Sequence, residues 1–69
     1  MVKHTTSIGT FGSRLQAARI AKDLTQWQLA KRLKVDRVTL ARWETDAQLP
    51  SPLARFRLAK LFGEELFAT

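Results

Sequence analysis

Apolar residues recur every three or four positions along most of the chain, which is the spacing of one face of an α-helix. The first set consists of Phe11, Leu15 and Ala18. It predicts a helix whose first turn is capped by Thr10 or Ser13, since either residue could fill that position. This helix closes at Asp23 and Leu24.

A capping box marks the start of the second predicted helix. Thr25 is followed three residues later by Gln28, so each side chain can bond the backbone N–H of the other residue. The apolar face that follows consists of Leu29, Ala30 and Leu33. Together these signals predict a helix over residues 26–33.

A third helix is predicted over residues 37–45. Asp36 is a suitable N-cap, and Asp46 stands where a left-handed residue often follows the end of a helix. At about 100° per residue, Leu40 and Trp43 project on the same side of this helix. We expect that side to pack in the core.

Two signals enclose the last long helix. Ser51 followed by Pro52 supplies an N-cap and a proline at the first helical position. Gly63 then stops the helix, which ends at Phe62. Residues 64–67 can add one more turn. No run alternates with a period of two, so the sequence predicts an all-α fold, a compact bundle of four to five short helices.

Length and composition limit the fold to one small domain. The 69 residues are 45% hydrophobic and include no cysteine, so packing must supply the stability, with help from any self-association. We interpret residues 1–9, which are polar and without period, as a flexible arm and residues 10–69 as the folded domain. No stretch reaches the roughly 18–20 apolar residues that cross a membrane, so we expect a soluble, cytoplasmic protein.

The charge of the chain predicts a polyanionic partner. Twelve Lys and Arg face six Asp and Glu, which gives a formal net charge of +6 and a pI near 10.9. From Arg14 to Arg42 there are eight basic and two acidic residues, so the excess lies inside the helical region and not in a tail. Lys and Arg also decorate many solvated helix faces, and charge alone does not distinguish DNA from RNA or anionic lipid.

The outward side of the third predicted helix has the chemistry for reading DNA. It carries Arg37, Val38, Ala41 and Arg42. A helix fits the DNA major groove, about 12 Å wide, where the planar fork of arginine can meet O6 and N7 of guanine. The start of the preceding helix, at Thr25 and Gln26, presents unpaired N–H groups that favour a phosphate.

A spaced set of residues in this region is more specific than any of its members. It consists of Leu15, Arg19, Thr25, Gln26, Leu29, Ala30, Val35, Leu40, Trp43, Glu44 and Pro50. The set resembles the helix-turn-helix DNA-binding domains of the phage repressor and Cro type, also called the Xre family, from about Phe11 to Gly63. The resemblance implies a lambda repressor-like fold with a central helix-turn-helix.

The resemblance also implies a role for individual positions. The positions that would read bases are Gln26, Arg37, Val38, Thr39 and Arg42. The positions expected near phosphates are Arg19, Thr25, Lys34 and Thr45. In several members the residues that match Arg19 and Glu44 form an ion pair, and the residue that matches Gln26 can brace the first reading residue. We expect the same contacts here.

Four departures from the family pattern concern the turns and the C-terminal part. Lys34 and Asp46 stand where glycine is frequent, and a left-handed Lys34 would cost about 1 kcal/mol. Arg55 occupies a usually apolar position, and the segment after Gly63 is two or three residues shorter than the usual fifth helix. The last two departures leave the surface used for dimerisation open.

Enzymatic activity and a metal site have little support. The chain has no Ser-His-Asp set and no glycine-rich phosphate loop, and so small a core leaves no room for a pocket of about 300 Å³ or more. His4, the only histidine, lies in the arm without a second ligand. We therefore expect no enzyme, no cofactor and no bound metal.

Three functions remain open. The leading hypothesis is a sequence-specific transcriptional regulator, a repressor or activator, that binds double-stranded DNA as a homodimer on an inverted repeat. The second is a protein-interaction adaptor or antitoxin-like module, in which Trp27 meets the partner. Otherwise Trp27, which projects with Lys31 and Lys34, packs at the rim or touches the sugar-phosphate backbone of DNA. The adaptor contact would also use the leucine-rich C-terminal part, where the candidates are Leu53, Leu58, Leu61, Leu66 and Phe67. The third is non-specific or RNA binding through charge alone, and RNA is the weakest of these because the chain lacks the interleaved exposed aromatic residues that stack single strands.

Overall fold

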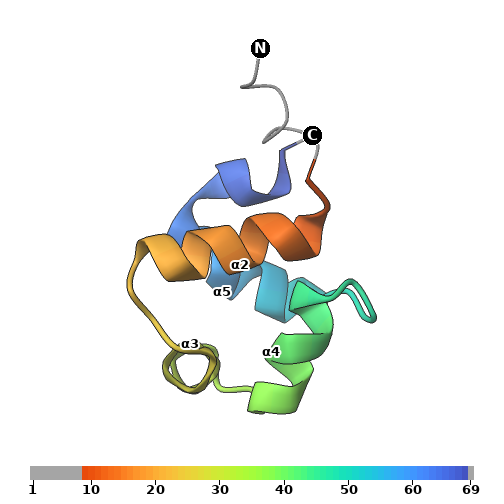
Figure 1. The fold of residues 1–69 in the computed structure, drawn as a ribbon. Coiled ribbons are helices and arrows are strands. Elements are labelled where there is room, and N and C mark those ends of the chain that lie inside the picture. The colour runs from red at the N-terminus through yellow and green to blue at the C-terminus, as the bar shows by residue number, and fades with distance from the viewer. Residues whose placement is uncertain (1–8, 69) are drawn as a thin grey trace.

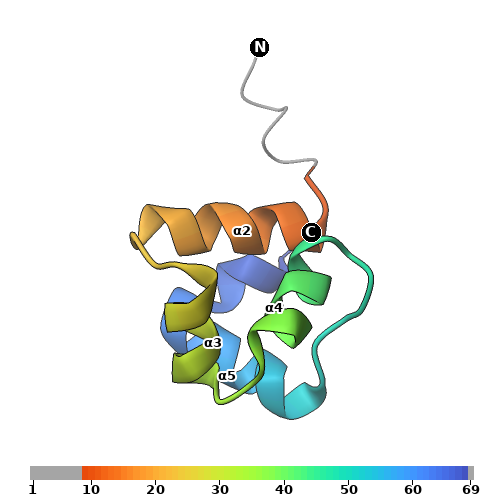
Figure 2. The same ribbon diagram turned by 60° about the horizontal axis from the view of Figure 1, so that its bottom comes forward.

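The chain forms a small bundle in which a long first helix crosses the next two. A computed structural model describes residues 9–68, so the expected arm and His4 lie almost entirely outside the described residues. The elements are α2 (Phe11–Ala21), α3 (Gln26–Leu33), α4 (Arg37–Glu44), α5 (Pro52–Phe62) and the 3₁₀ helix η1 (Glu64–Phe67). Figures 1 and 2 show α2 above α3 and α4; in Figure 1, α5 passes behind α2 and η1 lies above it. The predicted all-α fold is confirmed. In this described part, every helix is too short and too polar to cross a membrane.

Side-chain caps explain where most of the helices begin. Thr10, and not Ser13, caps α2, because its hydroxyl oxygen accepts from the Ser13 N–H at 3.1 Å. The capping box of α3 is complete, with both Thr25–Gln28 bonds formed. Ser51 caps α5 by accepting from the Ala54 N–H. Asp36 is the N-cap residue of α4, as predicted, although its side chain makes no capping bond.

Three helices end in a left-handed residue that is not glycine. Asp23, Lys34 and Asp46 have φ angles of 60°, 61° and 64°. In each case the next residue donates its N–H back to a carbonyl of the last turn, as when Val35 donates to Ala30 at 3.0 Å. The predicted left-handed Asp46 is confirmed. Lys34 provides the tight turn between α3 and α4 at the steric cost expected from the sequence.

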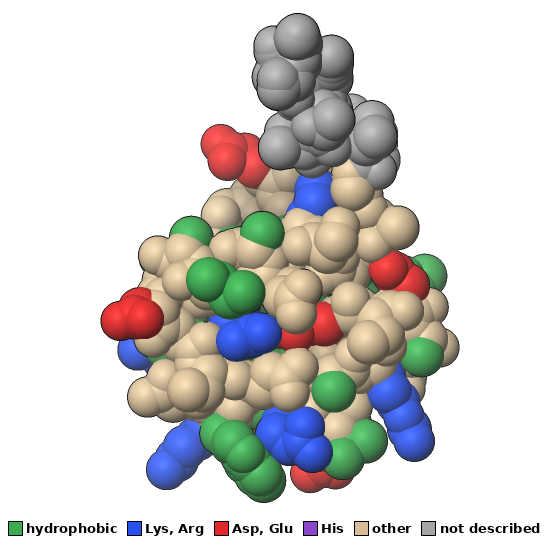
Figure 3. Space-filling view, viewed as in Figure 1, with side chains coloured by type: hydrophobic (Ala, Val, Ile, Leu, Met, Phe, Trp, Pro, Cys, Tyr) green, Lys and Arg blue, Asp and Glu red, His purple; other side chains and the backbone are tan. Residues whose placement is uncertain are grey.

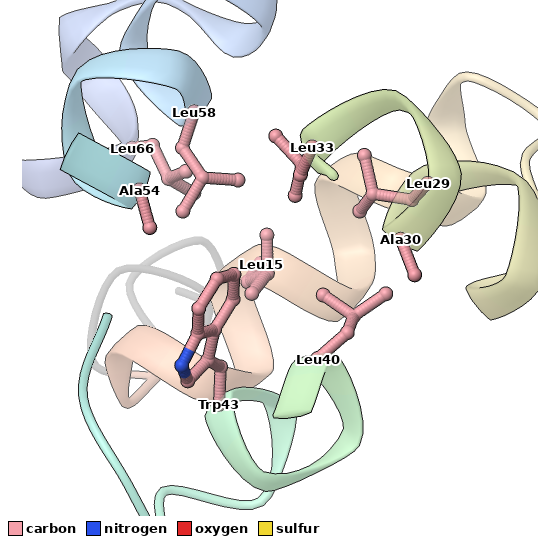
Figure 4. Close-up of a cluster of buried hydrophobic side chains, with 9 residues drawn as sticks. All are labelled: Leu15, Leu29, Ala30, Leu33, Leu40, Trp43, Ala54, Leu58 and Leu66. Carbon is pink, nitrogen blue, oxygen red and sulfur yellow. The ribbon is translucent and has the colours of Figure 1, made fainter. Parts of the chain in front are cut away.

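Nine buried side chains from every element form the core. Figure 4 shows Leu15 of α2 between the α3, α4 and α5 side chains. The members are Leu15, Leu29, Ala30, Leu33, Leu40, Trp43, Ala54, Leu58 and Leu66. The indole Nε1 of Trp43 has no hydrogen-bond partner within residues 9–68, so Trp43 serves the core through its apolar area.

Most of the C-terminal side chains that the sequence offered for a protein contact belong to the core instead. Leu58 and Leu66 are buried, and Leu61 and Phe67 pack against the core. The reason is that η1 folds back across α5 and α2 and so covers these side chains. Leu53 remains exposed.

The C-terminal turn is fastened to the start of α2 by aromatic and polar contacts. Phe67 stacks on Phe11 with ring centroids 5.3 Å apart. Arg14 donates to the carbonyls of Leu66 and Gly9 at 3.3 and 2.8 Å. Arg55 lies over the Phe67 ring at 4.5 Å, so this unusual charge sits on the surface and stabilises the turn through a cation–π contact.

Gly12 lies at the closest approach of α2 to α4. A Cβ at this position would be 2.5 Å from the carbonyl oxygen of Glu44 and 2.7 Å from that of Trp43. The Gly12 N–H donates to Asp46 Oδ1 at 2.9 Å. Glycine therefore fixes the angle at which α2 crosses the end of α4.

Through Asp46, the stability of the contact between α2 and the end of α4 should depend on pH. Hydrogen bonds from the Thr10 hydroxyl and from the Gly12 N–H lower the pKa of the Asp46 carboxyl, and the charge of Arg14 adds to the effect. Because the pKa of Asp46 is lower in the folded protein than in the unfolded chain, its ionised carboxylate stabilises the fold. This contribution is complete above the ordinary pKa of an aspartate, about 4, and is lost as the pH falls through the lowered pKa of the folded protein. We expect thermal unfolding between pH 7 and strongly acidic pH to be less pH-dependent in Asp46→Asn than in the wild type. Asp23→Asn, also at a left-handed helix end, controls for the amide substitution, and equal pH profiles of wild type and Asp46→Asn would contradict the expectation.

Candidate nucleic-acid interface

The two sides of α4 face opposite environments, as its sequence pattern predicts. Leu40 and Trp43 are at most 2% exposed and point into the core. On the other side Val38 is half exposed, Arg42 is exposed, and Arg37, Thr39 and Ala41 are partly accessible. The helix therefore offers a surface ridge with two guanidinium groups, and the short Ala41 side chain leaves the backbone approachable.

A buried carboxylate anchors this ridge from behind. The side chain of Glu44 is only 2% exposed and pairs with Arg19, whose Nε donates at 2.7 Å and whose Nη2 donates at 3.2 Å. Arg19 also donates from Nη1 to the carbonyl of Leu24 at 2.9 Å. The contact expected from the family resemblance is thus present, and it joins the C-terminal parts of α2 and α4.

Gln26 connects the buried carboxylate to the exposed arginine. Its Nε2 donates to Glu44 Oε1 at 2.9 Å, and its Oε1 accepts from Arg37 Nη1 at 3.2 Å. Because the nitrogen and the oxygen of the Gln26 amide are both hydrogen-bonded, the orientation of the amide is fixed. Its oxygen therefore holds the Nη1 side of the Arg37 guanidinium group in place. Gln26 therefore braces Arg37, which is one of the two roles the resemblance left open for it.

Trp27 provides a second contact to Arg37. The guanidinium carbon of Arg37 lies 5.2 Å from the centre of the indole ring, within the range of a cation–π contact. The indole is 70% exposed, so the expectation that Trp27 packs at the rim is wrong. The sequence pattern places Trp27 on the same side as Lys31 and Lys34, and the angle between α3 and α4 brings Arg37 to it as well.

Of the four residues expected near phosphates, Thr25, Lys34 and Thr45 are exposed at the ends of α3 and α4. The fourth, Arg19, is largely buried against Glu44. The capping box uses the N–H groups of Thr25 and Gln28, which leaves those of Gln26 and Trp27 as first-turn donors without an acceptor in residues 9–68. Lys34 is exposed. The Thr45 hydroxyl is exposed but donates to carbonyls of its own helix. In Figure 3, Lys and Arg side chains project from the lower edge, where Figure 1 places α3 and α4.

Comparison with known families gives a match over most of the chain. A family model described as helix-turn-helix matches residues 15–67. The chain belongs to this helix-turn-helix family, of the Xre type. Curated proteins and solved structures gave no significant match. As a member of the family, the protein is a DNA-binding helix-turn-helix regulator, and α3 and α4 with the turn at Lys34 form its helix-turn-helix.

Several basic residues of this helix-turn-helix protein are committed to the fold, which the sequence did not reveal. Arg57 donates to the carbonyl of Leu33 at 2.9 Å and so closes the end of α3, as Arg14 does for η1. Beside Arg57 lies an open surface groove of about 480 Å³. It is lined by Arg32, Leu33, Arg57, Lys60 and Leu61.

Proposed function

We propose that the protein is a transcriptional regulator, a repressor or activator, that recognises a specific double-stranded DNA sequence with the outward ridge of α4. The observation that carries this proposal is the braced position of Arg37. A base-reading arginine is most selective when its fork is held before DNA arrives, and Arg37 is held by both Gln26 and Trp27. Such a protein would act where cellular DNA is accessible, in the cytoplasm of a bacterial or phage-infected cell.

Direct reading would use the outward ridge of α4. Arg37 and Arg42 supply forks that suit guanine, and Val38, half exposed between them, suits a thymine methyl group. Thr39 is partly accessible on the same helix. Gln26 contributes through its hydrogen bond to Arg37. One such helix contacts only a few base pairs.

Phosphate contacts would fix the ridge in the groove. The free N–H groups at Gln26 and Trp27 stand at the positive end of the α3 dipole, close to Thr25. Lys34 and Thr45 lie at the turn before α4 and at its end, where the DNA backbone would pass. Arg19 is largely occupied by Glu44, so we assign it mainly to positioning and only its remaining N–H groups to phosphate.

Selection of bound sequences from a random DNA pool at physiological salt tests the proposal. Two copies on an inverted repeat would place two α4 helices in grooves about 34 Å apart, one turn of the duplex. We expect a symmetric enriched motif with guanine in each half. A pool without enrichment would contradict sequence-specific binding.

Arg37→Ala and Lys34→Ala separate base reading from phosphate binding. Arg37→Ala should weaken binding to the selected site by about 1–3 kcal/mol and relax the preference at one base position. Lys34→Ala should weaken all sequences alike and reduce the slope of log K against log salt by about one. Titrations of the selected site and of single-base variants at several salt concentrations measure both effects. Equal losses from Arg37→Ala on every sequence would refute its base-reading role.

The alternative function as a protein-interaction adaptor or antitoxin-like module is favoured by the exposure of Trp27 and of Leu53. The C-terminal side chains that such a contact would also use are mostly in the core. Trp27 has a role in the leading proposal, since it holds Arg37. A protein partner that still bound Trp27→Ala normally would count against the adaptor.

A further inference from the structure

The groove beside Arg57 combines an apolar floor with a rim of basic side chains. It lies between the end of α3 and the second half of α5, and we call it the α3–α5 groove. Leu33 and Leu61 supply its apolar part, and the basic residues around them are Arg32, Arg57 and Lys60. Within the described part of the chain, no acidic residue lines it.

The charges of the α3–α5 groove are not balanced by the fold. The one ion pair formed within residues 9–68 joins Arg19 to Glu44, so Arg32 and Lys60 are exposed cations without a carboxylate. Arg57 is held in place, because its Nη1 donates to the carbonyl of Leu33 at 2.9 Å. That bond uses only one of the several N–H donors of its guanidinium group. Three like charges around one hollow favour an anionic ligand.

The open shape of the groove favours a peptide over other anions. A small-molecule site buries about 70–90% of its ligand, which an open surface groove does not do. A DNA backbone offers phosphates but no apolar group for the accessible part of Leu61. An acidic peptide can place an apolar side chain on the floor and carboxylates on the rim, as in the centre and edge of a protein interface.

This chain does not supply such a peptide. Residues 1–8 include no acid. Glu64 and Glu65 stand beside Leu66, but Leu66 is only 6% exposed and belongs to the core, so this stretch cannot leave η1 without uncovering the core. Two α3–α5 grooves placed face to face would repel each other, since their charged residues are all basic. The occupant is therefore a different protein.

We propose that the α3–α5 groove binds an acidic segment of a partner protein, in which a large apolar side chain is flanked by Asp or Glu. The apolar side chain rests on Leu33 and Leu61. The flanking carboxylates pair with Arg32 and Lys60 on the two walls, and Arg57 lies between the helices to complete the basic rim.

The α3–α5 groove opens away from the side of α3 that holds Arg37. At about 100° per residue, Arg32 lies about 140° around α3 from Trp27, the residue that contacts Arg37. The residues of the groove are also distinct from those assigned to base reading and phosphate contact. The inference therefore goes beyond the proposed function, because the protein can hold DNA and this partner at the same time.

Selection from a displayed library of random peptides tests the inference on the wild-type protein. We expect the recovered peptides to combine acidic residues with a large apolar residue. Replacing that apolar residue of the peptide by serine should weaken binding at least about tenfold in a fluorescence anisotropy titration. A library without enrichment, recovered peptides that lack acids, or a serine peptide that binds as well as its parent would overturn the proposal.

Charge-neutralising variants test the assigned position. Arg32→Gln and Lys60→Gln should each weaken binding of the selected peptide about two- to fivefold, the range for exposed ion pairs. Lys31→Gln is a matched control, because Lys31 is an exposed neighbour on α3 that does not line the groove. Lys60→Gln also loses the contact with the Phe56 ring, so thermal unfolding of each variant is followed alongside. A folded variant with both substitutions that binds the peptide like Lys31→Gln would overturn the assigned groove.

A duplex oligonucleotide separates failure of this inference from failure of the proposed function. We expect the peptide to bind the protein that is already saturated with duplex DNA, and peptide binding not to respond to Arg37→Ala. DNA that displaces the peptide, together with weaker peptide binding in Arg37→Ala, would show that the acidic peptide occupies the α4 ridge and would overturn the inference. A protein that binds the peptide through the groove but prefers no DNA sequence would overturn the proposed function and leave the inference standing.

Discussion

Replacement of Glu44 by alanine is expected to lower the free energy of unfolding by about 3–5 kcal/mol, the range for breaking a buried ion pair. The loss is large because three donor groups lose their acceptor together: Arg19 Nε, Arg19 Nη2 and Gln26 Nε2. The Arg19 side chain is only 12% exposed, so water cannot fully replace the carboxylate. Urea unfolding followed by circular dichroism measures the change.

A double variant distinguishes the unpaired charge from the lost packing. Arg19→Met combined with Glu44→Leu removes both charges and keeps apolar volume, so it should be more stable than Glu44→Ala. Glu44→Ala, where it remains folded, should also lose preference at the base position assigned to Arg37, because Gln26 is no longer held. A loss of stability below about 1 kcal/mol would show that the pair is solvated in solution.

Gly12→Ala is expected to be the most damaging small substitution in the chain. The added methyl group would meet backbone atoms of Trp43 and Glu44 at 2.5–2.7 Å, and backbone atoms cannot rotate away. Overpacking of this kind should cost about 3 kcal/mol or more, which lowers the melting temperature by roughly 12 °C or more in a domain of this size. Helix propensity alone predicts the opposite sign, a gain of about 1 kcal/mol.

Thermal unfolding of a control on the same helix checks this reasoning. Gln16 is exposed on α2, and Gln16→Ala should change the free energy of unfolding by less than about 0.5 kcal/mol. If Gly12→Ala matched Gln16→Ala, the close crossing of α2 and α4 would be wrong. A large loss in Gly12→Ala alone would support it.

The helix bounds could be predicted because their causes are local. Thr25 and Gln28 satisfy each other within four residues, and Ser51, Pro52 and Gly63 act on the turns in which they stand. Such signals are complete in a short piece of sequence. Asp36 shows their limit, because its residue type permits a cap that its side chain does not make.

Long-range contacts could not be predicted in the same way. The importance of Gly12 depends on Glu44, 32 positions later, and nothing near Gly12 in the sequence signals that approach. The C-terminal leucines were misjudged for a similar reason. Periodicity identifies the face on which Leu58 lies, but only the return of η1 across α5 decides that the face is covered.

The residues of the candidate site could be predicted from the sequence, but the contacts between its two helices could not. The outward position of Arg37 follows from the period of α4, and the pairing of Arg19 with Glu44 follows from the resemblance to a family. The contact of Trp27 with Arg37 depends on the angle between two helices, which the Lys34 turn sets. The periodicity of α3 and that of α4 do not predict the angle between the two helices.

The bond from Gln26 to Arg37 has a consequence for exchanging specificity between regulators. An α4 transplanted alone would carry the arginine into a new scaffold without the amide and indole that orient it. The transferable recognition unit is therefore a patch spread over two helices, and chimeras should exchange Gln26 and Trp27 together with the α4 ridge.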